Sequence, residues 1–247
     1  MKPKLSQVFL RDESALKNIA KIISPKKDDV IFEIGPGKGQ LTKYLIPDAK
    51  KVIACEIDKK LVPYLKSLNA EIINQDFLKT TIPKEVTIIV GNIPYHLSGK
   101  ITEKVLKENK RCVILYQKEF AARLVAKPCT KDYSRLTVLA NYLSNPMVKL
   151  IVSRNSFSPV PKVDSALVEF SPVNKDYDEL FFKFVKSLFE FKNKSVKNAL
   201  ICSRREWSGE VDKRKLKGNV ANNSDRKVVS LSIPELLKEY EIFKKSC

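Results

Sequence analysis

The chain has 247 residues, of which 43% are hydrophobic and 30% are charged, and its formal net charge is +18. This length suits one large domain with a small second one. The charge predicts a polyanionic partner such as nucleic acid. No apolar run is long enough to span a bilayer, so we expect no membrane partner and a cytoplasmic monomer.

The cysteines and the histidine argue against a metal site. The five cysteines are scattered and form no C-x-x-C pair. This usage is typical of a reducing compartment, and it disfavours both a disulfide framework and a zinc site. The single histidine, His96, cannot build a histidine-rich site, so we expect no metal.

Strands and helices alternate through the first two thirds of the chain. Asp12 has the position of a helix N-cap, and apolar residues at helical spacing follow it to about residue 24. Apolar runs predict strands at residues 30–34, 52–55, 71–74, 86–91, 112–116, 148–152 and 165–170. The segments between them favour helices at 40–46, 61–68, 101–106, 118–126 and 136–143. This order predicts an α/β fold with a Rossmann-like sheet and helices on both faces.

Four successive predicted strands each end in one candidate contact. Gly35 opens a glycine-rich turn, Glu56 lies 21 residues further on, and Asp76 and Asn92 follow the next two strands. An acid at this distance can accept hydrogen bonds from ribose hydroxyls, and ligands of open α/β sheets bind at the carboxyl ends of strands. The repeated placement predicts one binding crevice.

The stretch Asn92-Ile93-Pro94-Tyr95 has the groups needed to hold a nucleobase amine. Pro94 forces a turn, an amide and backbone carbonyls can accept hydrogen bonds, and the ring of Tyr95 can stack on a base. Taken alone, this tetrapeptide is more simply interpreted as a proline-containing turn with a half-buried tyrosine.

Helical periodicity alone follows residue 172. Between residues 183 and 217 there are eleven Lys or Arg and four Asp or Glu. We therefore predict a domain at residues 1–172 and a small, basic, helical domain at 173–247.

Several stretches together resemble the ribosomal RNA adenine dimethyltransferases, which are Rossmann-like class I methyltransferases. They are SQVFL at 6–10, FEIGPGKGQLT at 32–42, CEID at 55–58, QDFL at 75–78, GNIPYHL at 91–97 and FSPVPKVDSAL at 157–167. The run at 117–138 and Pro36 are similar to the branch that acts on the small subunit. Ile93 and His96-Leu97 look a little like the branch that acts on the large subunit and gives macrolide resistance.

The resemblance implies S-adenosylmethionine as the cofactor and names the residues of the site. The cofactor-binding residues would be Gln7, Val8, Leu10, Gly35, Gly37, Glu56, Ile57, Asp76, Phe77 and Asn92. The catalytic residues would be Asn92, Pro94, Tyr95 and Phe157, with the two aromatic rings on either side of the target base.

The implied reaction is dimethylation of two adjacent adenosines in the hairpin near the 3′ end of small-subunit rRNA. The implied partner is the immature small ribosomal subunit, which the basic second domain would contact. Two alternatives stay open at this point: the large-subunit, macrolide-resistance type of enzyme, and a non-catalytic rRNA-binding assembly factor.

Overall fold

The structure is a computed structural model that describes residues 8–203 and 225–245. The chain forms two compact units, one of Met1–Ala121 with Leu143–Lys175 and the other of Ala122–Tyr142 with Asp176–Cys247. Within the described ranges, no helix combines the length and the apolar character that a bilayer crossing requires.

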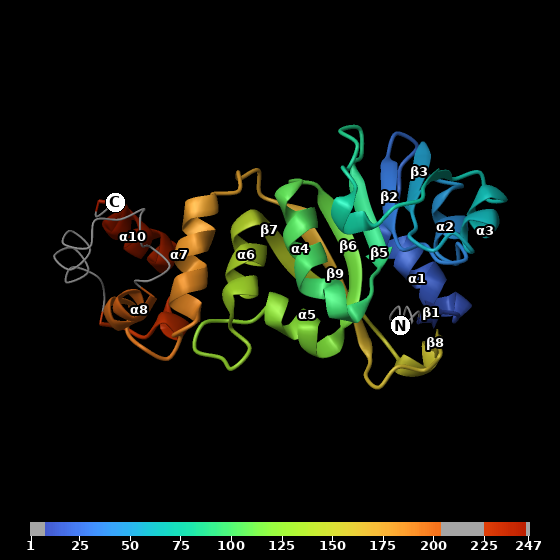
Figure 1. The fold of residues 1–247 in the computed structure, drawn as a ribbon. Helices are drawn as coiled ribbons and strands as arrows, with labels where there is room; N and C mark the ends of the chain where they lie inside the picture. Colours follow the sequence, from blue (N-terminus) through green and yellow to red (C-terminus); the bar gives the residue numbers. More distant parts are fainter. Residues whose placement is uncertain (1–7, 204–224, 246–247) are drawn as a thin grey trace. The chain divides into compact units, whose positions relative to one another are not determined.

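The first unit is organised around a seven-stranded sheet (Figure 1). Its strand order is β4-β3-β2-β5-β6-β9-β7. Strands β4, β3, β2, β5 and β6 run parallel to one another, whereas β9 is antiparallel to both β6 and β7. The bounds are Val30–Ile34 (β2), Lys51–Cys55 (β3), Glu71–Ile73 (β4), Ile88–Asn92 (β5), Arg111–Gln117 (β6), Ser144–Val152 (β7) and Ser165–Pro172 (β9).

Short helices follow the strands of this unit. Asp12 is the N-cap of the first helix, as predicted, because its carboxylate accepts hydrogen bonds from the N–H groups of Ser14 and Ala15. The α-helices are Glu13–Ile23 (α1), Thr42–Leu45 (α2), Val62–Lys66 (α3), Ser98–Lys107 (α4) and Lys118–Leu124 (α5, whose last three residues belong to the second unit). Three 3₁₀ turns are Phe77–Lys79 (η1), Tyr95–Leu97 (η2) and Arg154–Ser156 (η3).

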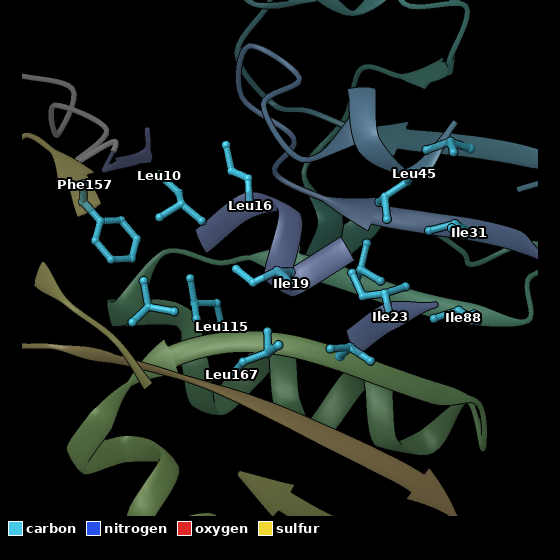
Figure 2. Packing of buried hydrophobic residues seen from close by; sticks show 14 residues of the cluster. Leu10, Leu16, Ile19, Ile23, Ile31, Leu45, Ile88, Leu115, Phe157 and Leu167 are labelled. Carbon is cyan, nitrogen blue, oxygen red and sulfur yellow. The ribbon is translucent and has the colours of Figure 1, made fainter. Parts of the chain in front are cut away.

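The sheet buries apolar side chains on both faces. On one face, the apolar stripe of α1 packs against Ile31, Ile88, Leu115 and Leu167 (Figure 2). On the other face, Tyr116 stacks on a ring of α5 and shares a hydrogen bond of 2.8 Å with a hydroxyl of α4. The α/β class with helices on both faces is therefore confirmed.

A two-stranded sheet joins the start of the described chain to a distant segment. Strand β1 (Phe9–Leu10) pairs antiparallel with β8 (Phe157–Ser158). This pairing ties residues 9–10 to residues 157–158 within the first unit.

The second unit is helical. Its helices are Arg135–Leu143 (α6, whose last residue belongs to the first unit), Glu179–Phe189 (α7), Val196–Ser203 (α8) and Ile233–Lys244 (α10), with a 3₁₀ turn at Val228–Ser230 (η5). Aromatic contacts fill its core, where the ring of Phe184 lies 5.5 Å from Tyr240 and 5.0 Å from Phe243. The expected helical character of residues 173–247 is confirmed for the described part of this range, where the regular elements are helices and one isolated bridge joins Ser195 and Lys227.

The segment 122–142 belongs with these C-terminal helices, although the sequence prediction assigned it to the first domain. The hydroxyl of Tyr133 donates to the carbonyl oxygen of Leu231 at 2.7 Å. The N–H of Cys129 donates to the carbonyl of Val229 at 2.8 Å. Contacts between residues about a hundred positions apart leave no periodic signal in the sequence.

Gly91 is required by the packing of β5. A Cβ built there would lie 2.8 Å from the carbonyl oxygen of Ile34 on the neighbouring strand. We expect Gly91→Ala to destabilise the fold by about 1–3 kcal/mol and to lower the melting temperature by roughly 2–4 °C per kcal/mol. Gly99→Ala is the matched control, because in the described part of the chain no atom beyond its chain neighbours and the backbone of its own helix lies within 4 Å of its Cβ position. Equal melting temperatures for the two variants would contradict the packing constraint.

Candidate functional site

The parallel register aligns the carboxyl ends of three strands. Ile34 pairs with Cys55 on one side and with Gly91 on the other. The residues that follow these strands therefore emerge at one edge of the sheet. Gly35, Glu56 and Asn92 lie at this edge, which is where open α/β sheets bind ligands.

A cavity of about 220 Å³ occupies this edge. The glycine-rich turn, the ends of β3, β4 and β5, and the opening strand β1 all contribute to it. Among the residues predicted from the sequence, those lining it are Val8, Leu10, Gly35, Gly37, Glu56, Ile57, Asp76, Phe77, Asn92, Pro94 and Tyr95. Gln7 lies outside the described residues.

The glycine-rich turn depends on a backbone conformation that side chains disfavour. Gly35 and Gly37 have φ angles of +63° and +64°, in the left-handed region that glycine adopts without steric cost. A Cβ at Gly37 would also lie 2.9 Å from the ring of Phe9 on β1. The turn can therefore approach both the opening strand and a ligand closely.

Glu56 places a buried carboxylate in the cavity, where the side chain is 4% exposed. One oxygen accepts from the N–H of Gly37 at 3.1 Å and the other from the N–H of Asp58 at 2.9 Å. Burial raises the pKa of Glu56, and the two N–H groups oppose that rise. Each carboxylate oxygen can accept a further hydrogen bond, such as one from a ligand hydroxyl.

Asp76 and Phe77 form the part of the cavity that follows β4. One carboxylate oxygen of Asp76 accepts from the N–H of Leu78 at 2.9 Å and caps the 3₁₀ turn η1. The ring of Phe77 is buried and lies 5.9 Å from the ring of Phe32. Asp76 therefore supplies an acceptor beside an apolar wall.

The side-chain amide of Asn92 is held by the opening segment. Its nitrogen donates to the carbonyl oxygen of Val8 at 3.3 Å. This bond orients the amide and leaves its oxygen, the acceptor, for a ligand. The sequence prediction assigned Val8 to the cofactor, and in the structure its carbonyl also positions Asn92.

Pro94 and Tyr95 complete the turn. The carbonyl oxygen of Pro94 accepts from the N–H of Leu97 at 3.0 Å and keeps one lone pair. The hydroxyl of Tyr95 shares a hydrogen bond of 2.8 Å with the buried hydroxyl of Ser165. Burial raises the pKa of Tyr95, and the bond to Ser165 opposes the rise. The bond to Ser165 thus fixes the hydroxyl end of the Tyr95 ring.

Phe157 does not line the cavity, in contrast to the predicted pairing of its ring with that of Tyr95. It is 3% exposed and packs in the hydrophobic cluster beside Leu10 (Figure 2). The pairing of β8 with β1 sets this orientation, because it makes Leu10 the partner of Phe157. Sequence alone could not reveal which way the ring turns.

Glu33 is a cavity residue that the sequence prediction missed. It is 2% exposed, and one carboxylate oxygen accepts from the hydroxyl of Thr42 at 2.7 Å. Burial raises the pKa of Glu33 to about 7; Thr42 lowers it, and the nearby charge of Glu56 adds to the rise. A carboxylate inside the apolar strand VIFEI was the available signal, because isolated buried carboxylates are costly.

The site combines an apolar cavity with carboxylate, amide and carbonyl acceptors. Within residues 8–203 and 225–245, no cluster of three or more His, Cys, Asp or Glu side chains could hold a metal. The arrangement suits a ligand with hydroxyl groups, and a second molecule that presents an amine to Asn92 and Pro94. Such a site favours reactions that depend on positioning.

Comparisons with known proteins agree with this geometry. The sequence model of the family described as ribosomal RNA adenine dimethylase matches residues 1–245. The chain is 40% identical over 216 residues to a probable ribosomal RNA small subunit methyltransferase A of Methanopyrus kandleri, covering 83% of this chain and 78% of that protein.

Two solved structures are similar over almost the whole chain. A dimethyladenosine transferase from Plasmodium falciparum has a TM-score of 0.81 and 29% identity, covering 96% of this chain and 98% of that one. The 23S rRNA methyltransferase ErmE has a TM-score of 0.69 and 27% identity, covering 96% and 99%.

The raised pKa of Glu33 predicts a pH-dependent stability. Between its ordinary value of 4.5 and about 7, the folded chain binds a proton that the unfolded chain has lost. The stabilisation from the neutral carboxyl is therefore complete below about pH 4.5 and is lost as the pH rises through 7.

We expect Glu33→Gln, which mimics the neutral acid, to gain stability relative to the wild type between pH 5 and pH 8, by up to about 3 kcal/mol. The gain is measured from the free energies of unfolding of both proteins at pH 5 and at pH 8. Glu13→Gln is the control, because it makes the same change at an exposed position. If the difference in free energy of unfolding between Glu33→Gln and the wild type does not vary with pH, the assignment of Glu33 as a buried neutral acid is wrong.

Proposed function

The chain belongs to the ribosomal RNA adenine dimethylase family, and from this premise we propose that it dimethylates two adjacent adenosines in the hairpin near the 3′ end of small-subunit rRNA. The observation that carries the proposal is the convergence of Asn92, Pro94 and Tyr95 on a cavity that also contains Glu56 and Asp76. Methylation of rRNA adenine is the activity of the family. The choice of adenosines is our proposal.

Two findings favour the small-subunit branch over the macrolide-resistance type. The relative from Methanopyrus kandleri is named a small subunit enzyme. The dimethyladenosine transferase structure has a higher TM-score than ErmE at similar coverage. The immature small ribosomal subunit is accordingly the proposed partner, and the protein would act as a monomer in the cytoplasm, where it meets that partner.

The residues of the cavity fit S-adenosylmethionine as the methyl donor. The carboxylate of Glu56 can accept hydrogen bonds from both ribose hydroxyls, because each oxygen has a lone pair beyond its bond to Gly37 or Asp58. Asp76 and the wall of Phe77 suit the adenine, and the open turn at Gly35 suits the methionine end. A Cβ at Gly35 would have no neighbour closer than 3.8 Å, so space exists there.

S-adenosylmethionine supplies a methyl carbon that is already activated by the adjacent sulfonium. The task left to the protein is to orient the target amine. The amide oxygen of Asn92, held by Val8, and the free lone pair of the Pro94 carbonyl can accept the two amine hydrogens. These bonds favour a pyramidal nitrogen, which is the geometry of the transition state.

The target base must leave its stack to reach these acceptors. The ring of Tyr95 lines the cavity and offers a stacking face, while Ser165 fixes its hydroxyl. Stacking of this kind is worth about 1–3 kcal/mol per base. Because Phe157 is buried in the core, we assign the stacking to Tyr95 alone.

The helical unit is the proposed contact for the remainder of the rRNA. Lysines on its described helices and loops, such as Lys183, Lys186 and Lys197, supply positive charge for phosphate contacts. The stretch 204–217 contributes to the basic surplus but lies outside the described residues. A non-catalytic assembly factor would need the same charge, so activity measurements must separate the two functions.

We expect Glu56→Ala to weaken binding of S-adenosylmethionine by at least about 10-fold, because charge-assisted hydrogen bonds are worth roughly 1.5–3 kcal/mol each. Affinity for rRNA should stay near the wild-type value, since Glu56 is buried in the cavity. Calorimetry with the cofactor and a filter-binding assay with rRNA measure the two affinities. Glu71→Ala, an exposed substitution on β4, is the control. Unchanged cofactor affinity in Glu56→Ala would refute the ribose assignment.

The proposed function is tested by single-turnover methyl transfer to immature small subunits, with the modified adenosines mapped. Asn92→Ala removes an acceptor that strengthens in the transition state, so we expect transfer to fall by at least about 10²-fold with subunit binding nearly unchanged. Tyr95→Ala should impair both capture of the base and transfer.

The matched control is Asn145→Ala, which removes an exposed asparagine side chain on β7. Wild-type transfer by Asn92→Ala would mean that residues 92–95 form only a turn. Binding of subunits without any transfer by the wild-type protein would favour the assembly-factor alternative.

A further inference from the structure

Lys104 differs from the many exposed lysines of this chain in the way its ammonium group is used. It lies on α4, and its Nζ donates to the carbonyl oxygens of Phe77 at 2.8 Å, Leu78 at 3.1 Å and Thr80. An ammonium group has three donors. All three are used within the protein, so Lys104 is not available to bind RNA phosphate.

The three carbonyls belong to the short loop that follows β4. This loop carries Asp76 and Phe77 into the cavity. Its own bonds, from Leu78 N–H to the Asp76 carboxylate and from the Thr80 hydroxyl to the Asp76 carbonyl, hold one side of it. Lys104 adds bonds to the carbonyls at the end of η1, where the carbonyl of Phe77 also accepts from the N–H of Thr80 at 3.1 Å.

The same ammonium also contacts an aromatic ring of the cavity wall. Its Nζ lies 5.0 Å from the ring centroid of Phe77, within the range of a cation–π contact. The side chain of Lys104 is partly buried, which strengthens both kinds of interaction relative to a fully exposed lysine. Lys104 thus restrains the backbone and the ring of Phe77 together.

The location of Lys104 in the chain links two parts of the site. Helix α4 begins three residues after Tyr95, directly behind the turn that carries Asn92 and Pro94. We propose that Lys104 is a positioning residue for the adenine end of the cofactor, because it fastens the loop of Asp76 and Phe77 to the helix behind the target-base turn. This inference rests on the proposed binding of S-adenosylmethionine.

The test compares Lys104→Met with Lys107→Met. Methionine keeps an unbranched apolar stem at position 104 but removes the three donors and the charge. Lys107 lies on the same helix, is exposed, and pairs with Glu103 at 3.4 Å. We expect Lys104→Met to weaken calorimetric binding of S-adenosylmethionine by at least about 10-fold, and Lys107→Met to leave it unchanged.

A second ligand separates positioning from general destabilisation. With the adenine beside Asp76, the carboxylate of Asp76 can accept a hydrogen bond from the adenine amine. The inosine analogue of S-adenosylmethionine lacks this amine, so the wild type should bind it more weakly than the cofactor. If Lys104 positions Asp76, this preference for the amine should shrink by several-fold in Lys104→Met. A merely destabilised fold would weaken both ligands equally and keep the preference.

Lys104→Arg serves as the conservative variant, and it should restore part of the preference because it keeps donors and charge. Unchanged cofactor affinity in Lys104→Met, or an unchanged preference for the amine, would overturn the role of Lys104. Failure of the wild-type protein to bind S-adenosylmethionine would instead refute the proposed function itself, so the two failures are distinct.

Discussion

The pairing of β2 with β3 on one side and with β5 on the other is the constraint on which the site depends. It sets Ile34 beside both Cys55 and Gly91, so the residues that follow these three strands emerge at the same height along the sheet. A shift of one residue would turn every side chain of a strand to the opposite face. Gly91 helps to fix this register, because only a residue without a Cβ fits against the carbonyl of Ile34.

The electrostatics of the cavity oppose those of the whole chain. The chain carries a net charge of +18, which suits a polyanion, whereas the cavity contains the buried carboxyl groups of Glu33 and Glu56. A carboxylate such as that of Glu56 in a low-dielectric site favours a cationic ligand over a neutral one. S-adenosylmethionine has a sulfonium charge that its demethylated product lacks. Under the proposed assignment, the carboxylate of Glu56 therefore favours the charged donor over its uncharged product.

The sequence predicted those features that are local or periodic, and it missed those set by distant contacts. The order of strands and helices, the N-cap Asp12 and the polar residues after successive strands all follow from local patterns. The buried ring of Phe157 depends on pairing with a strand almost 150 residues earlier. The role of Lys104 is likewise hidden, because a lysine on a predicted helix resembles any solvated lysine until the loop beside it is known.

The acceptors around the target amine imply that the two methyl transfers proposed here are not equivalent. An unmodified amine has two hydrogens, one for the amide oxygen of Asn92 and one for the carbonyl of Pro94. After the first transfer, one hydrogen remains, so one of these acceptors loses its partner at a cost of about 1–3 kcal/mol if it stays buried. The Pro94 carbonyl keeps its bond from the N–H of Leu97, whereas the bond that orients the Asn92 amide uses its nitrogen and not its oxygen. The remaining hydrogen is therefore better placed on Asn92, and the second transfer must rely more on the ring of Tyr95, which Ser165 holds in position.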